Sequence, residues 1–355
     1  MKTGLSLTEL ARKIEGNRDL KSDMVASTAG MKVSADPDGV ASLQIKDGTL
    51  ATSSFPILPT AHDQIGARLA IPGRYYDRML KDEPDLLAAN VNTWLRRNPE
   101  RRMLRTLGGN LRAFLSDRYQ RIENEEIAEV VLPILADIPD VRIVSSEITD
   151  RRMFISAVSP RVAGEVKKGD VVQAGVTISN SEIGHGAVVV QPLVYRLVCL
   201  NGMALPDSKF AARHVGRQLD ERENLNAIFA DDTRKADDRA VLLKVRDMVK
   251  AAVDEVRFGE TVGRMANLTE AKVKGDPVKA VEVLAKKVGA AEFERGGILK
   301  SLIEGGDLSA WGLLNAVTHQ AHGAASYDRS MDFVAAGGAL LTLPKSDWRE
   351  ILEAA

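Results

Sequence analysis

The side chains best suited to chemistry are the arginines between residues 96 and 121. This short stretch contains two acids, Glu100 and Asp117, no lysine, and eight arginines: 96, 97, 101, 102, 105, 112, 118 and 121. The planar guanidinium group pairs with a phosphate through two parallel hydrogen bonds, and it also stacks on nucleobases. The type and density of these residues therefore indicate contact with the backbone of a nucleic acid.

Aromatic and turn residues accompany these arginines. Trp94 and Tyr119 flank the stretch and offer stacking surfaces, and Gly108-Gly109-Asn110 predicts a tight turn between two strands. We expect a nucleic-acid groove to be lined by Arg97, Arg101, Arg102, Arg105, Arg112, Arg118 and Tyr119. In the alternative interpretation, the arginines form ion pairs with nearby acids: Glu123, Glu125, Glu126 and Glu129.

A second basic cluster lies further along the chain. It consists of Lys209, Arg213 and Arg217, and it adds to the residues predicted to bind nucleic acid. Its alternative interpretation is a solvated loop that connects a β-rich part of the chain to a helical part.

Two histidines, His319 and His322, have the spacing that places side chains on one face of a helix. A metal site needs a third and usually a fourth ligand, and no glutamate follows the first histidine as it does in zinc proteases. Asp328 and Asp332 are acids nearby, but nothing in the pattern selects them as ligands. We therefore expect a pair of histidines at a helix end and no metal site.

Signatures of catalysis are missing from the sequence. It contains neither a Walker-type phosphate loop nor a Gly-x-Ser-x-Gly nucleophile motif. The single cysteine, Cys199, lies in an apolar run and is expected to pack in the interior. The sequence thus predicts no catalytic residue and no cofactor, and a binding protein in place of an enzyme.

The composition is that of a globular chain without a membrane span. Of 355 residues, 45% are hydrophobic and 27% are charged, and 48 lysines and arginines nearly balance 49 acids. The near-neutral total excludes a polycation but not a local basic patch. The lone cysteine and the absence of an apolar leader predict a cytoplasmic protein without membrane contact.

Apolar periodicity predicts an α+β fold with a mostly antiparallel sheet, packed helices and a helical C-terminal extension. We expect a leader at 1–35, which could be mobile, an α+β core at 36–219, and a mainly helical region at 220–355. Within the last region, 237–258 reads as one long helix, and the end of the chain as a short strand at 339–343 before a terminal helix.

Three stretches together resemble a known family. They are Leu111–Tyr119 with the helix that ends at Val131–Leu135, then Tyr195–Met203, and then Trp311–His319. The chain is identified as a member of the phage/plasmid-like protein family, catalogued as domain of unknown function nine-thirty-two, over most of residues 60–350. The resemblance implies a protein encoded by phages, plasmids or integrated elements, often near recombination genes, and it supplies no catalytic residues.

The core of hairpins and helices and the arginine-rich turn also look similar to the single-strand annealing recombination proteins. This similarity implies a protein that binds and anneals single-stranded DNA without ATP or metal, as a homo-oligomeric ring or filament. Two alternatives stay open. One is a non-enzymatic accessory or host-defence-inhibiting interaction protein of a mobile element. The other is an unrecognised metal-dependent nuclease centred on His319 and His322.

Overall fold

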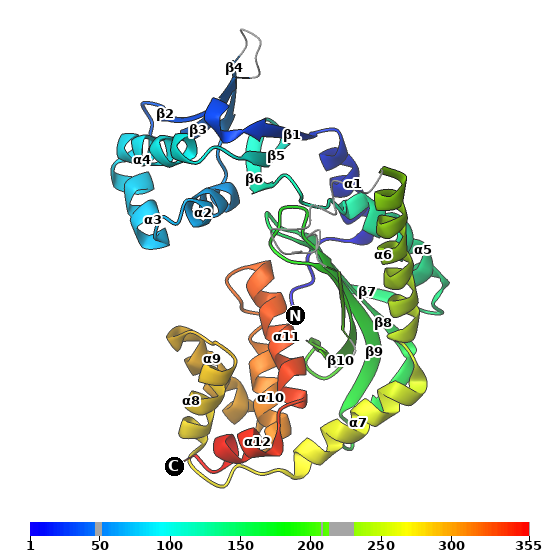
Figure 1. Cartoon of the computed structure of the whole chain (residues 1–355). Coiled ribbons are helices and arrows are strands. Elements are labelled where there is room, and N and C mark those ends of the chain that lie inside the picture. The colour runs from blue at the N-terminus through cyan, green and yellow to red at the C-terminus, as the bar shows by residue number, and fades with distance from the viewer. Residues whose placement is uncertain (47–51, 207–208, 213–230, 355) are drawn as a thin grey trace.

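The computed structural model describes residues 1–46, 52–206, 209–212 and 231–354. Helices and antiparallel strands alternate along these residues, so the predicted α+β class is confirmed. Figure 1 shows an upper lobe built from N-terminal elements, and below it a curved sheet that helices cover.

The N-terminal lobe contains two small sheets, three α-helices and a short 3-10 helix. Its elements are β1 (Lys21–Ser27), η1 (Thr28–Gly30), β2 (Met31–Ala35), β3 (Ala41–Lys46), β4 (Thr52–Pro56), α2 (Pro59–Arg68), α3 (Gly73–Asp82), α4 (Pro84–Arg97), β5 (Arg101–Leu107) and β6 (Asn110–Ser116). One sheet has the strand order β1-β5-β6 and the other β2-β3-β4, and all pairs are antiparallel.

The hairpin of β5 and β6 confirms the predicted turn. Gly108 and Gly109 form its two-residue loop and have φ angles of 56° and 80°. Positive φ at both positions is the requirement of the tight turn that matches the twist of a hairpin, and glycine meets it without strain. The turn fixes the register of both arginine-bearing strands.

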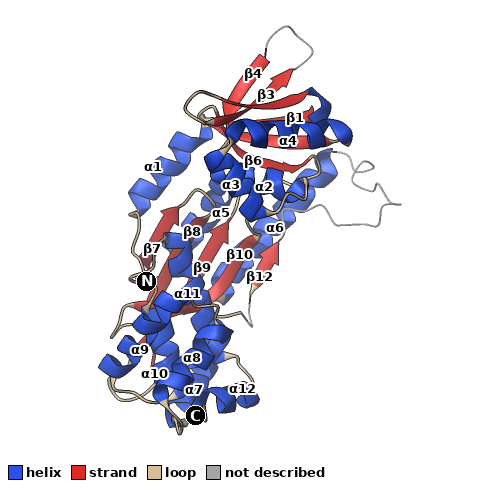
Figure 2. Ribbon diagram, turned by 90° about the vertical axis from the view of Figure 1, so that its left-hand side faces the viewer, coloured by secondary structure: helices blue, strands red, loops and turns tan. Residues whose placement is uncertain are grey.

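The central sheet is larger and also antiparallel. The elements that build it and flank it are α1 (Leu7–Arg18), α5 (Asn124–Asp137), β7 (Arg142–Ile148), β8 (Met153–Glu165), β9 (Val171–Asn180), β10 (Val188–Arg196), β11 (Asn201–Ala204) and β12 (Phe210–Ala212). The strand order is β11-β10-β9-β8-β7, and β12 also pairs with β10. Figure 2 shows these strands side by side.

The rest of the described chain is helical. Its elements are α6 (Asp231–Ala251), α7 (Glu255–Glu270), α8 (Pro277–Lys287), α9 (Glu292–Gly305), α10 (Ala310–His319), α11 (Tyr327–Leu341) and α12 (Lys345–Leu352). The single helix predicted at 237–258 is wrong, because two helices meet there. The Asp254 carboxylate accepts a hydrogen bond from the Arg257 amide at 2.9 Å and starts the second helix.

Helices cover both faces of the central sheet, because the side chains of its strands alternate between two cores. On β8, Ile155 belongs to the core shared with α1, α5 and α6, whereas Phe154 belongs to the core shared with α7 to α12. β9 also contributes to both cores, with Ile178 in the first and Ala174, nearer the start of the strand, in the second. Buried on both faces, these strands are nearly continuous in apolar residues.

The predicted leader at 1–35 is wrong, because these residues are part of the fold. Met1 is buried in the core with the C-terminal helices, and Gly4 bridges to Ser146 of β7. The first sheet begins with β1, which pairs with β5, and the predicted boundary at 35 cuts between the paired strands β2 and β3. The other predicted boundary, 219–220, lies outside the described residues.

The short strand predicted at 339–343 is also wrong, because residues 327–341 form α11. Gly337 faces Thr318 of α10, and Gly338 faces the backbone of Ala204 in β11. Because these glycines have no side chain, α11 can approach α10 and β11 closely. The small residues near the end of α11 therefore serve helix packing and do not form a strand. Within the described residues, no helix combines the length and the apolar character that a membrane span requires.

We predict that Gly338→Ala destabilises the fold by about 1–3 kcal/mol or more, because the new Cβ would overlap the Ala204 carbonyl oxygen. Gly259→Ala is the control. This glycine lies inside α7 with open space around it, so alanine there should stabilise by roughly 0.5–1 kcal/mol. Urea unfolding measures both. Equal effects of the two substitutions would contradict the close packing of α11.

Candidate nucleic-acid interface

Two arginines of the predicted groove are buried and have no access to a phosphate. Arg105 is 1% exposed and Arg112 is 9% exposed. A β-bulge lies between Arg105 and Thr106, and Arg112 has no partner residue in the register of β5 and β6. Such bulges redirect side chains, and here the extra residue points toward acids in the interior. The assignment of Arg105 and Arg112 to the groove is therefore wrong.

The buried guanidinium groups are held by carboxylates. Arg105 donates from Nε to Asp23 at 2.9 Å, pairs with Glu123, and donates to the backbone carbonyl of Glu182 at 2.5 Å. Arg112 donates to the Glu182 carboxylate at 2.8 Å. A buried charge is tolerated only with such partners. The alternative interpretation, pairing with nearby acids, holds for Arg105 with Glu123, whereas Arg112 pairs with Glu182, which is distant in sequence.

Lys21 completes this cluster from the first position of β1. Its ammonium nitrogen lies 3.2 Å from a Glu123 oxygen, 2.6 Å from Glu125 and 2.6 Å from Glu182. The ammonium group has three N–H donors, and each meets one carboxylate. We use "buried ion network" for the full set: Lys21, Asp23, Arg105, Arg112, Glu123, Glu125 and Glu182.

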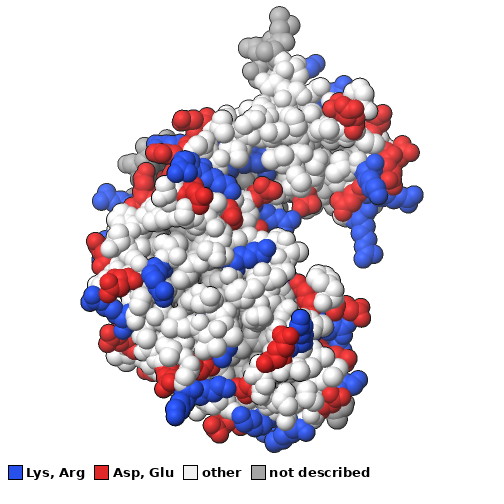
Figure 3. All heavy atoms as spheres, turned by 180° about the vertical axis from the view of Figure 1, so that it is seen from behind, with Lys and Arg blue, Asp and Glu red and all other residues white. Residues whose placement is uncertain are grey.

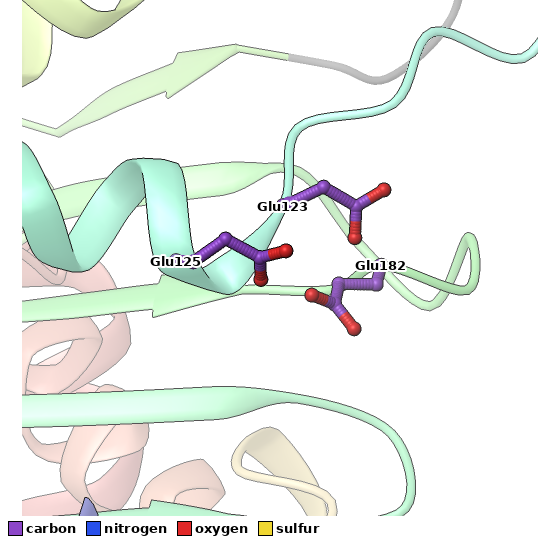
Figure 4. A group of neighbouring side chains, drawn as sticks. All are labelled: Glu123, Glu125 and Glu182. Atoms are coloured by element: carbon purple, nitrogen blue, oxygen red, sulfur yellow. The ribbon is translucent and has the colours of Figure 1, made fainter. Parts of the chain in front are cut away.

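The three glutamates have the arrangement of a metal site. Figure 4 shows Glu123 and Glu125 at the start of α5 and Glu182 in the loop after β9, with converging carboxylates. Of all His, Cys, Asp and Glu side chains in the described ranges, only this trio brings ligand atoms within 4.8 Å of one another. Because the Lys21 ammonium already bonds to all three, we interpret the cluster as structural.

The buried ion network joins the N-terminal lobe to the central sheet. Lys21, Arg105 and Arg112 come from the lobe, whereas Glu182 follows the sheet strand β9. Burial alone would raise the pKa of Glu182, but Arg112, Lys21 and the Asn124 amide outweigh it and lower the pKa to about 2. Burial raises the pKa of Glu123 above its ordinary value, against the attraction of Arg105. Of Glu123 and Glu182, Glu182 is therefore held more firmly in its ionised form.

Of the other four predicted groove arginines, three are exposed to solvent, whereas the Arg102 side chain is only 13% exposed. Arg97 ends α4, Arg101 and Arg102 begin β5, and Arg118 follows β6. Three of them, with Arg68, line a shallow depression of about 490 Å³ that is completed by Glu100, Ser116 and Asp117. We use "arginine face" for the set Arg68, Arg97, Arg101, Arg102 and Arg118.

Contacts within the arginine face hold its guanidinium groups in place. Arg68 donates two hydrogen bonds to the Glu100 carboxylate, and the one from Nε to Oε1 is 2.6 Å long. Arg102 lies 4.9 Å from the ring centre of Phe114, and Arg97 lies 5.4 Å from that of Trp94, which is 39% exposed. The exposed Arg97 keeps hydrogen-bonding groups available for a phosphate, whereas Arg102 donates to the Phe114 carbonyl at 3.4 Å and its Nε is buried.

Arg68 is a member that sequence reasoning missed, because it lies in α2, well before the arginine-rich stretch. Only folding brings the end of α2 beside Glu100. The one available signal was a basic residue in the last turn of α2. The structure also changes the role of Tyr119. Its hydroxyl donates to the Ser181 carbonyl at 3.1 Å and its ring packs beside Ile183, so we remove it from the stacking residues.

The second basic cluster adds little to this surface. Lys209 is exposed directly before β12, at an edge of the central sheet that shares no strand with the arginine face. Arg213 and Arg217 lie outside the described residues.

The histidine pair has partners other than a metal. His319 and His322 have ring centres 5.3 Å apart. His319 contacts the Ser301 hydroxyl at 3.2 Å, and His322 contacts the Cys199 carbonyl at 2.9 Å and the amino group of Met1 at 3.1 Å. These contacts fit the predicted pair at a helix end.

The surface charge is mixed on the face shown in Figure 3, where basic and acidic side chains alternate and a notch separates the upper lobe from the lower part. A long-range field of one sign is therefore not the basis of recognition on that face. Any contact with a polyanion has to use a local group of cations such as the arginine face.

A family model described as "Domain of unknown function (DUF932)" matches residues 113–332, or 220 of the 355 residues. The chain belongs to this family. The match confirms the family resemblance stated from the sequence. The DUF932 region covers the central sheet and most of the helices, whereas most of the arginine face precedes it: Arg68, Arg97, Arg101 and Arg102. No curated protein and no solved structure matches the chain.

We predict that Lys21→Met lowers the free energy of unfolding at neutral pH by about 3–5 kcal/mol, because three carboxylates lose their buried cation. Lys13→Met is the control, since the Lys13–Glu147 pair is exposed and should contribute at most about 1 kcal/mol. Urea unfolding compares them. Magnesium or manganese should raise the melting temperature of the Lys21→Met variant but not that of the wild type. If the melting temperature of the variant does not rise, the interpretation that the three glutamates surround a cation is contradicted.

A second prediction concerns the stability of the fold at low pH. Because folding lowers the pKa of Glu182 to about 2 from an ordinary value near 4.5, its stabilisation is present above pH 4.5 and is lost as the pH falls toward 2. Glu182→Gln should therefore cost about 3 kcal/mol at pH 7 and progressively less in acid. Denaturant midpoints of both proteins over this range measure the difference. A difference independent of pH would show that Glu182 is not the ionised anchor.

Proposed function

We propose that this protein binds single-stranded DNA through the arginine face and anneals complementary strands, in the recombination of a phage or mobile element. The observation that supports the proposal is the group of four arginines that line one depression, together with Arg97 stacked on the exposed Trp94 at the end of α4. Four guanidinium groups and two carboxylates, those of Glu100 and Asp117, line this depression. The local excess of positive charge favours a polyanion.

The mechanism is physical. Arginines neutralise phosphates and release the counterions that these carried, which drives binding. Trp94 offers a face on which a base stacks, whatever its identity. A strand held by its phosphates keeps base edges open to a second strand, so pairing itself tests the register. None of these steps consumes ATP or passes through a metal ion.

A single strand suits the arginine face better than a duplex. Its cations come from α2, the end of α4, the start of β5 and the turn after β6, so they follow no straight line along one element. A flexible single strand can follow such a path, whereas duplex DNA is stiff over a length of roughly 50 nm. In this account the protein acts in the cytoplasm, and several copies extend the contact along the strand.

We predict that replacing Arg97, Arg101 and Arg118 together by glutamine weakens binding to oligothymidylate by about tenfold or more at low salt. The slope of log affinity against log salt should fall by about 2, at roughly 0.7 for each lost phosphate contact on a single strand. Fluorescence anisotropy over a salt series measures both quantities. The annealing rate of two complementary oligonucleotides without ATP should fall in parallel.

The control is a second triple variant that removes the same charge elsewhere. Arg161, Arg257 and Arg349 are exposed and lie outside the arginine face, so their replacement by glutamine should leave affinity unchanged. Equal loss in both variants would mean that net charge, and not the arginine face, governs binding. Absence of any binding by the wild type at low salt would reject the function, and the face would then suit an acidic protein partner.

A further inference from the structure

The Glu100 carboxylate contacts two guanidinium groups of the arginine face at once. Arg68 donates to both of its oxygens, and the Arg102 Nε lies 3.9 Å from its Oε1. The hydrogen bond from Arg68 lowers the pKa of Glu100, which keeps the carboxylate charged well below neutral pH. A guanidinium fork that faces a pair of oxygens is also the geometry in which arginine binds a phosphate. Glu100 thus occupies a position that suits a phosphate of a DNA strand.

This carboxylate satisfies the two cations only in part. The Arg102 Nε is buried and has no hydrogen-bond partner among the described residues, since 3.9 Å to Glu100 is beyond hydrogen-bond reach. Burial lowers the pKa of Arg102; the Glu100 charge opposes this effect, and the like charge of Arg68 adds to it. A tetrahedral phosphodiester is larger than a carboxylate and carries more oxygens, so one such group can face both guanidinium groups.

The pair between Arg68 and Glu100 is weak enough to open. The Arg68 side chain is 51% exposed and that of Glu100 27%, and such pairs contribute little stability because water competes with the partner. The backbone of Glu100 is held independently of its carboxylate. Its amide donates to the Thr28 hydroxyl at 3.0 Å, and its carbonyl accepts from the Thr28 amide at 2.8 Å. The side chain can therefore turn toward solvent while the start of β5 keeps its place.

We propose that Glu100 competes with the DNA backbone: its carboxylate pairs with Arg68 and Arg102 in the free protein, and a phosphate of the bound strand displaces it. This inference rests on the proposed function and adds a regulating residue to the same site. Both guanidinium groups then face an anion in the free and in the bound state, so a strand can leave without exposing two like charges to each other. Binding is weaker than the arginines alone would give, and it is more readily reversed.

Glu100→Gln tests the competition, because the amide keeps the size of the side chain and removes its charge. We expect this variant to bind oligothymidylate about fivefold more tightly than the wild type at low salt, the effect of roughly one charge at ion-pair distance in water. Fluorescence anisotropy measures the affinity. Asp117→Asn is the control, because it removes the same charge from the same depression and leaves the pairs of Glu100 in place. Equal tightening in both variants would overturn the proposal.

A double-mutant cycle with Arg68→Gln shows whether the gain depends on the released guanidinium group. Glu100→Gln should tighten binding much less when Arg68 is also replaced, because the arginine that it frees is then missing. A gain of the same size with and without Arg68 would refute the competition, and melting temperatures confirm that all four proteins are folded. Binding by the wild type without tightening in Glu100→Gln would reject the competition alone. Absence of binding by both proteins at low salt would reject the proposed function, and this inference with it.

Discussion

The buried ion network is the constraint on which the rest of the structure depends. Lys21 and Arg105 enter a region that excludes water, and each buried charge has to meet an opposite charge there. The acids come from three places: Asp23 in β1, the start of α5, and Glu182 after β9. The pairing of these buried charges therefore fixes how the N-terminal lobe is attached to the central sheet. It also sets the direction in which the β5–β6 hairpin presents its outer residues.

One arginine-rich stretch thus has two roles, divided by position along the strands. Arg101 and Arg102 begin β5 at the edge of the lobe and lie in the depression, whereas Arg105 lies further along at the junction with the central sheet. The bulge sends Arg112 to the same junction. The inner arginines stabilise the fold through carboxylates, and the outer ones carry the surface that we propose for DNA.

Periodicity in the sequence predicted the α+β class, the mostly antiparallel sheet and the helical C-terminal region, because buried faces leave clear apolar patterns. Periodicity did not predict the structure correctly where contacts between residues distant in sequence determine it. Residues 339–343 read as a short strand, although 339–341 end helix α11, whose Gly338 packs against Ala204 of β11. Residues 19–35 look weakly patterned because their partners, such as β5 for β1, are distant in sequence. Arg105 could not be distinguished from Arg101, since burial follows from the junction and not from residue type, and Arg68 joins them only through folding.

The most direct test of the central claim is hydrogen–deuterium exchange of the full chain with and without oligothymidylate. The account predicts slower exchange at the end of α4, the start of β5 and the turn that contains Arg118, with exchange in the C-terminal helices unchanged. Protection confined to the C-terminal helices, or no protection under conditions where the DNA is bound, would contradict the assignment of the arginine face.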